Sequence, residues 1–374
     1  MSSLYGDYAC TPTLKRVFYG PGCLSTALPR LLEILQVKKA LIVTGNTLRT
    51  KTDVVERIEN ILKEHNAFGG VFHDIHQHVP VAGINNGAQA FKDYGADFIV
   101  SVGGGSPIDA SKAILHKIWK ERGTSEPPVQ VAIPTTLGAA EYTYGAGFTN
   151  EAGVKVGVND PLLTPAGVVL DASLTLATPE RLWLSTGIRA VDHCVENLTR
   201  NLYPLLLKPL CYAALADFFK YLPITKAEPQ NVEVRQRLQL AAMMSLWPLQ
   251  QDKFTVLGLS HLLGHRLGAA YNIGHGITSC ITLPAVLALQ AEIATPEMKQ
   301  CLADCLFYLR EPSTGSVEGD IRKLSELIAQ LIVDLGLKST MSEYHVPRED
   351  IPKLAGNSED PNYPKIVRVL ESVY

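Results

Sequence analysis

The chain has 374 residues, a formal net charge of −3, and 46% hydrophobic against 19% charged residues. Its length suits two domains and its apolar content suits packed cores, while interspersed charges without a basic stripe argue against disorder and against nucleic-acid binding. No apolar run reaches the roughly 20 residues needed to cross a bilayer, and the first residues lack the pattern of a secretion signal, so we expect a cytoplasmic protein with no membrane partner.

The first half of the chain alternates short β-rich runs with amphipathic stretches, which is typical of βαβ units around a mainly parallel sheet. Strands are predicted at residues 15–20, 38–45, 69–75, 97–104, 129–135 and 166–172. Helical patterns between them include residues 24–35 and 81–95. A hairpin is predicted over residues 144–158, with its turn at Asn150 to Gly153.

The second half changes character near Thr178, where long stretches with helical period replace the β-rich runs. We therefore predict two domains, an α/β domain over residues 1–177 and an all-helical domain over residues 178–374.

A glycine-rich turn at Gly103, Gly104 and Gly105 directly follows a predicted strand and precedes a predicted helix. Glycine lets the backbone approach a ligand closely, and Ser106 as N-cap with Pro107 in the first turn would present free amides to a phosphate. Such a turn also arises for purely steric reasons, and it fits neither the P-loop nor the GxGxxG pattern. It is therefore a candidate nucleotide site.

Two further turns follow predicted strands, YGPG at residues 19–22 and PTT at residues 134–136. Open α/β sheets bind ligands at the carboxyl ends of their strands, so several loops meeting there favour a long dinucleotide over a triphosphate. Where an acidic residue would exclude a 2'-phosphate, the chain has Thr44, Gly45 and Asn46. With Arg49 and Lys51 nearby, the cofactor is NADH or NADPH, although these two cations also suit a solvated helix start.

Three histidines, His261, His265 and His275, fall within fifteen residues among glycines, which favours a site over isolated core histidines. An earlier helical stretch adds His193, which shares a face with Arg189 and Glu196 because the spacings are four and three residues.

The segments GGGSPIDASK, IPTT, STGIRAVDHCVE and HLLGHRLGAAYNIGHG resemble the iron-type alcohol dehydrogenases in order and spacing over most of the chain. The resemblance implies a dehydroquinate synthase-like fold, with an N-terminal dinucleotide-binding α/β domain, an all-α C-terminal domain and catalysis between them. It also implies a homodimer; separately from the resemblance, residues 5–14, which precede the first predicted strand, suit an arm that packs on a partner. The expected cofactor-binding residues are Gly45, Asn46, Gly103, Gly104, Gly105, Ser106, Asp109, Thr135, Thr136, Leu137 and Lys155.

In the metal-dependent members of that family, an aspartate, a histidine four residues later and two histidines of the later motif bind a divalent metal. The corresponding residues here are Arg189, His193, His261 and His275. A guanidinium about 4 Å from a divalent cation would cost on the order of 8 kcal/mol at an effective dielectric near 20. Asp192 leaves the helix about 100° from His193 and is not expected to replace the aspartate. No metal site is therefore favoured; if a metal binds, His193, His261 and His275 are its expected ligands.

The segments HQHVP at residues 76–80 and PTTLGAAEYT at residues 134–143 resemble the maleylacetate reductase branch, whose members can work without metal. The resemblance implies NAD(P)H-dependent hydride transfer to an unsaturated or keto carboxylate, a small-molecule substrate. Arg189 would bind the carboxylate, unless it merely pairs with Glu196 or Asp192. The histidines that would supply charge and protons are His193, His261, His265 and His275.

Other interpretations stay open at this point. The chain could be a metal-dependent alcohol dehydrogenase or aldehyde reductase, a dehydroquinate synthase-like lyase, or a non-catalytic relative. A separate metal site at His73, His76 and His78 is disfavoured, since these residues are expected in a loop.

The seven cysteines are too widely scattered for a disulfide framework and are interpreted as reduced thiols. Cys301 and Cys305 have helical spacing, which favours core packing over metal binding.

Overall fold

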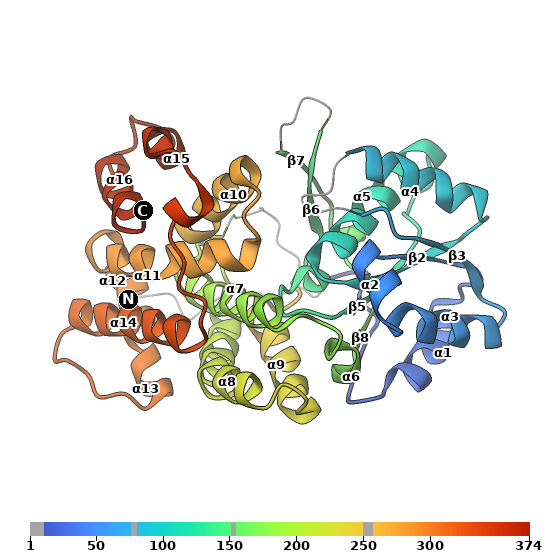
Figure 1. Cartoon of the computed structure of the whole chain (residues 1–374), viewed down its shortest axis with the longest axis horizontal. Helices are drawn as coiled ribbons and strands as arrows, with labels where there is room; N and C mark the ends of the chain where they lie inside the picture. The colour runs from blue at the N-terminus through green and yellow to red at the C-terminus, as the bar shows by residue number, and fades with distance from the viewer. Residues whose placement is uncertain (1–10, 76–80, 151–154, 250–256) are drawn as a thin grey trace.

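The computed structural model describes residues 11–75, 81–150, 155–249 and 257–374. Two bodies lie side by side in Figure 1, an α/β body formed by the first part of the chain and a helical body formed by the rest. The predicted fold class is therefore confirmed, whereas the predicted boundary between residues 177 and 178 stays a prediction.

The α/β body is built on one six-stranded sheet with the strand order β1-β8-β5-β4-β2-β3, and every pair of neighbours is parallel. The strands are β1 (Arg16–Tyr19), β2 (Ala40–Val43), β3 (Phe68–Phe72), β4 (Phe98–Gly103), β5 (Gln130–Pro134) and β8 (Gly167–Leu170). All six lie within the predicted β-rich runs or within one residue of them. Parallel pairing brings the carboxyl ends of β4 and β5 together at one edge.

Helices cover both faces of this sheet because successive strand residues point to opposite sides. Ile42 and Val100 pack with α1 (Leu24–Leu35) and α3 (Val54–Glu64) on one face. Leu41 and Ile99 pack on the other face, with α4 (Val81–Asp93) and α5 (Gly105–Arg122). The short helices α2 (Asn46–Lys51) and α6 (Ala172–Thr175) follow β2 and β8.

The predicted hairpin is present as β6 (Gly145–Thr149) paired antiparallel with β7 (Lys155–Asn159). It stands beside the sheet on the side of the helical body (Figure 1). Most of its predicted turn, His76 and His78, and most of the expected N-terminal arm lie outside the described residues.

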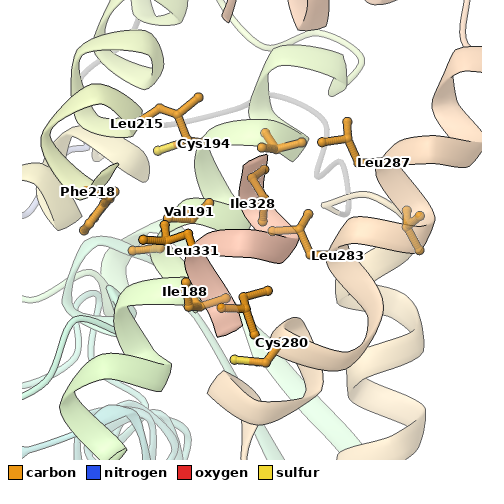
Figure 2. Packing of buried hydrophobic residues seen from close by; sticks show 14 of the residues in the cluster. Ile188, Val191, Cys194, Leu215, Phe218, Cys280, Leu283, Leu287, Ile328 and Leu331 are labelled. Atoms are coloured by element: carbon orange, nitrogen blue, oxygen red, sulfur yellow. The ribbon is translucent and has the colours of Figure 1, made fainter. Parts of the chain in front are cut away.

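The helical body contains α7 (Glu180–Thr199), α8 (Lys208–Ala227), α9 (Val232–Ser245), α10 (Leu259–Tyr271), α11 (His275–Ile293), α12 (Pro296–Ala303), α13 (Cys305–Leu309), α14 (Val317–Asp334), α15 (Ile351–Ala355) and α16 (Tyr363–Ser372). Figure 2 shows part of its core, where Val191 and Cys194 of α7 face Leu215 of α8 and Leu283 of α11. Cys305 belongs to the same core and Cys301 packs against it, as predicted.

Helix α11 is long and apolar enough to cross a membrane by length and composition, but 67% of its apolar 18-residue window is buried inside the protein. It packs against α7, α10 and α14, so its apolar character is that of a central core helix.

Candidate active site

A cleft of ≈ 1450 Å³ lies between the carboxyl edge of the sheet and the helical body. Its walls include the turn after β4, the end of β5, the hairpin, and parts of α7, α10 and α11. This volume exceeds the roughly 300–1,000 Å³ of a usual small-molecule pocket and suits a dinucleotide together with a substrate.

The turn between β4 and α5 has the geometry expected of a phosphate-binding loop. Gly103 has a positive φ of 134°, which favours glycine, and a Cβ on Gly104 would lie 3.2 Å from Cγ2 of Thr136. Helix α5 begins at Gly105, and its N-cap is Gly104 rather than the predicted Ser106, which lies inside the first turn. The first amides of the helix therefore belong to the glycine turn itself, and they fit a pyrophosphate.

The structure brings most of the expected cofactor residues to the cleft. The lining contains Gly45, Gly103, Gly104, Gly105, Ser106, Asp109, Thr135 and Thr136. Asn46 is exposed outside it, and Leu137 is buried, with its N–H donating to Oγ1 of Thr186 at 3.1 Å. The side chain of Lys155 lies outside the described part of the chain.

The YGPG turn contributes nothing to the described lining of the cleft. Instead, the N–H groups of Gly22 and Leu24 donate to the two carboxylate oxygens of Asp171, at 2.8 and 3.0 Å. The turn therefore binds the loop after β8, and the expectation that it faces the cofactor is wrong.

At the end of β2, Thr47 and Lys51 line the cleft. Arg49 forms an ion pair with the buried Glu59 at 2.5 Å, so it is anchored to α3. Lys51 is thus the cation that this corner offers to a cofactor, whereas Arg49 is held by Glu59 and fits neither of its two expected roles, a cofactor contact or a solvated helix start.

All five predicted catalytic residues line the same cleft. Arg189 and His193 come from α7, His261 and His265 from α10, and His275 from the start of α11. The rings of His193 and His261 stack with 4.9 Å between centroids, and those of His265 and His275 lie 5.5 Å apart.

Arg189 is buried and only 7% exposed. Its Nη1 donates to Oγ of Ser279 at 3.1 Å and lies 3.7 Å from Oδ2 of Asp192. The alternative of an Arg189–Asp192 pair is therefore present in the structure. Both contacts use Nη1 of Arg189. Within the described part of the chain, Nη2 and Nε of Arg189 have no hydrogen-bond or ion-pair partner.

Asp192 turns toward α10 and α11, which the sequence did not predict. Its Oδ2 accepts hydrogen bonds from Oγ of Ser260 at 2.9 Å and Oγ of Ser279 at 2.6 Å, and its Oδ1 lies 3.5 Å from Nδ1 of His261. The helical geometry does place Asp192 away from His193, but its carboxylate reaches His261 instead.

The surroundings shift the pKa values of the two stacked histidines in opposite directions. Burial and Arg189 lower the pKa of His261, but Asp192 and Glu196 outweigh them and raise it above its usual value. Burial, reinforced by the charge of His261, holds the pKa of His193 well below its usual value. Within the stacked pair, the surroundings therefore favour a proton on His261 and disfavour one on His193.

At the position where the resemblance places a metal, one expected ligand is missing. Arg189 offers no ligand atom and sets a buried cation beside the remaining candidates. Ligand-type atoms of Asp192, Glu196 and His261 do lie within 4.8 Å of one another. In that cluster, Nδ1 of His261 is hydrogen-bonded to Glu196, whereas Nε2 has no hydrogen-bond partner in the described part of the chain.

Several residues of the cleft were not predicted. They include Tyr142, Asn159, Arg181 and Arg200. Arg200 follows the end of α7 as its C-cap, with an extended backbone, so the helical spacing of α7 does not predict its place. Arg181 lies in the first turn of α7, whereas Tyr142 and Asn159 come from a short 3-10 turn and the hairpin, for which the sequence has no helical periodicity.

Comparison with known proteins assigns both parts of the chain to the same family. Residues 14–172 match the family described as iron-containing alcohol dehydrogenase, and residues 183–364 match the C-terminal domain of the same family. The chain is 28% identical to maleylacetate reductase 1 of Cupriavidus pinatubonensis over 359 residues, which cover 96% of this chain and 92% of that protein.

Alcohol dehydrogenases are equally similar. A 1,3-propanediol dehydrogenase of Citrobacter freundii is 28% identical, with 90% of this chain and 89% of that protein covered. The crystal structure of a 1,3-propanediol oxidoreductase superposes with a TM-score of 0.86 at 25% identity, covering 98% of this chain and 99% of that one. From the matched domains and the cleft, the chain belongs to the iron-containing alcohol dehydrogenase family and is an NAD(P)-dependent oxidoreductase.

Proposed function

We propose that this protein reduces an unsaturated or keto carboxylate with NADH or NADPH, in the manner of a maleylacetate reductase, and needs no tightly bound divalent metal. The observation that carries the proposal is Arg189, a buried cation that lines the cleft at the position of the family's aspartate ligand.

The charge of the cleft supports an anionic substrate. Among the described lining residues, Asp109 is the one acidic side chain, and it lies 3.0 Å from the buried Nζ of Lys112. The cations of the lining are Lys51, Arg181, Arg189 and Arg200. A cleft with this charge attracts both the cofactor phosphates and a carboxylate.

Different residues of the cleft have different roles in the proposed reduction. The glycine turn and Ser106 would hold the cofactor's pyrophosphate, and NADH or NADPH supplies the hydride when bound. Arg189 binds the substrate carboxylate through Nη2 and Nε, which fixes the substrate in the cleft. His261 stabilises the enolate or alkoxide charge and gives a proton, while His193, His265 and His275 complete the polar wall.

The choice between NADH and NADPH depends on the residues that line the cleft beside the carboxyl end of β2. No acidic residue among the described lining residues there would repel a 2'-phosphate, and Lys51 offers it a cation. We therefore expect both NADH and NADPH to be accepted.

The test compares substrates and an arginine variant in NADH oxidation. We expect maleylacetate and similar keto or unsaturated carboxylates to be reduced in preference to simple aldehydes. Arg189→Gln should raise KM for the carboxylate by about 10- to 100-fold, because a charge-assisted contact is lost, and leave the Kd of NADH unchanged. Arg237→Gln, at an exposed position on α9, is the matched control. Preference for aldehydes, unaffected by Arg189→Gln, would contradict the proposal.

A second candidate is a metal-dependent alcohol dehydrogenase or aldehyde reductase. The observation in its favour is that His193, His261 and His275 all line the cleft. In that case a metal would polarise the substrate carbonyl, and aldehydes would be the better substrates.

A further inference from the structure

Glu196 is a fully buried carboxylate that joins α7 to the beginning of α10. Its Oε1 accepts hydrogen bonds from the backbone N–H groups of Ser260 at 2.7 Å and His261 at 3.4 Å. Its Oε2 is hydrogen-bonded to Nδ1 of the His261 ring. One carboxylate therefore holds both the backbone and the ring of the same histidine.

The chain makes room for this contact at Gly258, the N-cap of α10. A Cβ at that position would lie 2.7 Å from Oε1 of Glu196, closer than real Cβ atoms approach oxygen. Glycine is therefore required there for the carboxylate to reach the first turn of α10.

The two ring nitrogens of His261 face different surroundings. Nδ1 contacts Glu196 and lies 3.5 Å from Asp192, whereas Nε2 is buried without a hydrogen-bond partner in the described part of the chain. His261 lines the cleft, but Glu196 does not belong to its described lining. The carboxylate thus lies behind the ring, and the unpartnered Nε2 is the atom left for a ligand.

We propose that Glu196 is a positioning residue that fixes the ring of His261, so that its unpartnered Nε2 is held for contact with the substrate of the reduction. The proposal rests on the proposed function, because it assigns a substrate contact of that reaction to one atom.

Glu196 could instead be only a helix cap, since a carboxylate at the N-terminus of α10 stabilises the helix. Glu196→Gln separates the two roles. The glutamine oxygen still accepts from the N–H of Ser260, but the side chain can no longer serve as an anionic acceptor for Nδ1–H. If Glu196 is only a helix cap, the Glu196→Gln protein loses thermal stability but keeps its turnover. If Glu196 positions His261, the variant loses turnover.

The decisive experiment is a double-mutant cycle of Glu196→Gln and His261→Asn, measured with NADH and the best carboxylate substrate. We expect Glu196→Gln to lower kcat by roughly 100-fold with KM and the Kd of NADH within about threefold of the parent. In the His261→Asn background, Glu196→Gln should lower kcat by less than about threefold, because the effect of Glu196 on kcat depends on the imidazole ring of His261. Asp320→Asn, a buried carboxylate of α14 that binds Ser313 and Thr314, is the matched control and should leave kcat unchanged.

Gly258→Ala gives an independent variant in case Glu196→Gln does not fold. Its added methyl displaces the carboxylate without changing the charge, so kcat should fall while KM stays constant. Equal losses of kcat from Glu196→Gln in both backgrounds, or a loss of thermal stability with kcat intact, would overturn the proposal.

The metal content of the parent protein, measured in parallel, tests the proposed function separately. A stoichiometric metal with intact coupling of Glu196 to His261 would contradict the metal-free function alone. No metal and no coupling would contradict the positioning role alone.

Discussion

The side chains of the site acquire their roles from partners on other helices. The spacing of Arg189, His193 and Glu196 was enough to predict that they share a face of α7. It could not show that Glu196 would meet His261, because that contact depends on how α7 and α10 pack across 65 residues of sequence. The same limit applies to Asp192, whose partners Ser260 and Ser279 come from α10 and α11.

Glu141 carries a testable pH dependence at the residue scale. It is 2% exposed, and burial raises its pKa from 4.5 to about 7, with Lys112 partly opposing the shift. The folded protein therefore keeps a proton that the unfolded chain releases above pH 4.5, so this residue's stabilising contribution is full below pH 4.5 and is lost as pH rises through 7.

We expect Glu141→Gln, which does not titrate, to gain thermal stability relative to the parent between about pH 5 and pH 8. The measurement is the difference in Tm between the two proteins at both pH values. The same change at the exposed Glu233 of α9 is the control and should show no such trend. A Tm difference that is constant or shrinks toward pH 8 would show that burial does not raise the pKa of Glu141.

At the scale of elements, the turn after β4 was predictable and the turn after β1 was not. An apolar strand followed by three glycines and a helix indicated a phosphate loop, and that loop lines the cleft. The YGPG turn has similar composition, but its amides are bound by Asp171, about 150 residues later. The N-cap was misplaced at Ser106 because the extended backbone of Gly104 begins the helix without a side-chain cap.

We expect Gly104→Val to weaken NADH binding by at least about 10-fold, because a β-branched side chain would crowd both Thr136 and the approaching phosphates. The Kd is measured by quenching or enhancement of NADH fluorescence. A thermal unfolding profile close to that of the parent serves as the control for folding. Unchanged NADH affinity would place the pyrophosphate elsewhere in the cleft.

At the scale of the whole molecule, the alternation of β-rich and amphipathic stretches was sufficient to predict a parallel sheet followed by a helical domain. The six strand positions followed directly from it, because buried parallel strands are short apolar runs. The cleft was predictable only through its histidines and glycines. Its charge is a property of loops and helices from both bodies, and depends on residues such as Arg181 and Arg200 that no motif marks.

The central claim is that the buried cation of Arg189 replaces a metal in binding a carboxylate substrate. The most direct measurement is the turnover of chelator-treated, metal-analysed protein with NADH and maleylacetate, before and after addition of Zn²⁺ or Fe²⁺. We expect turnover to stay within about twofold throughout, because Arg189 and His261 supply the positive charge that the reaction needs. Loss of turnover on chelation, with recovery on return of stoichiometric metal, would contradict the claim and favour the metal-dependent alcohol dehydrogenase.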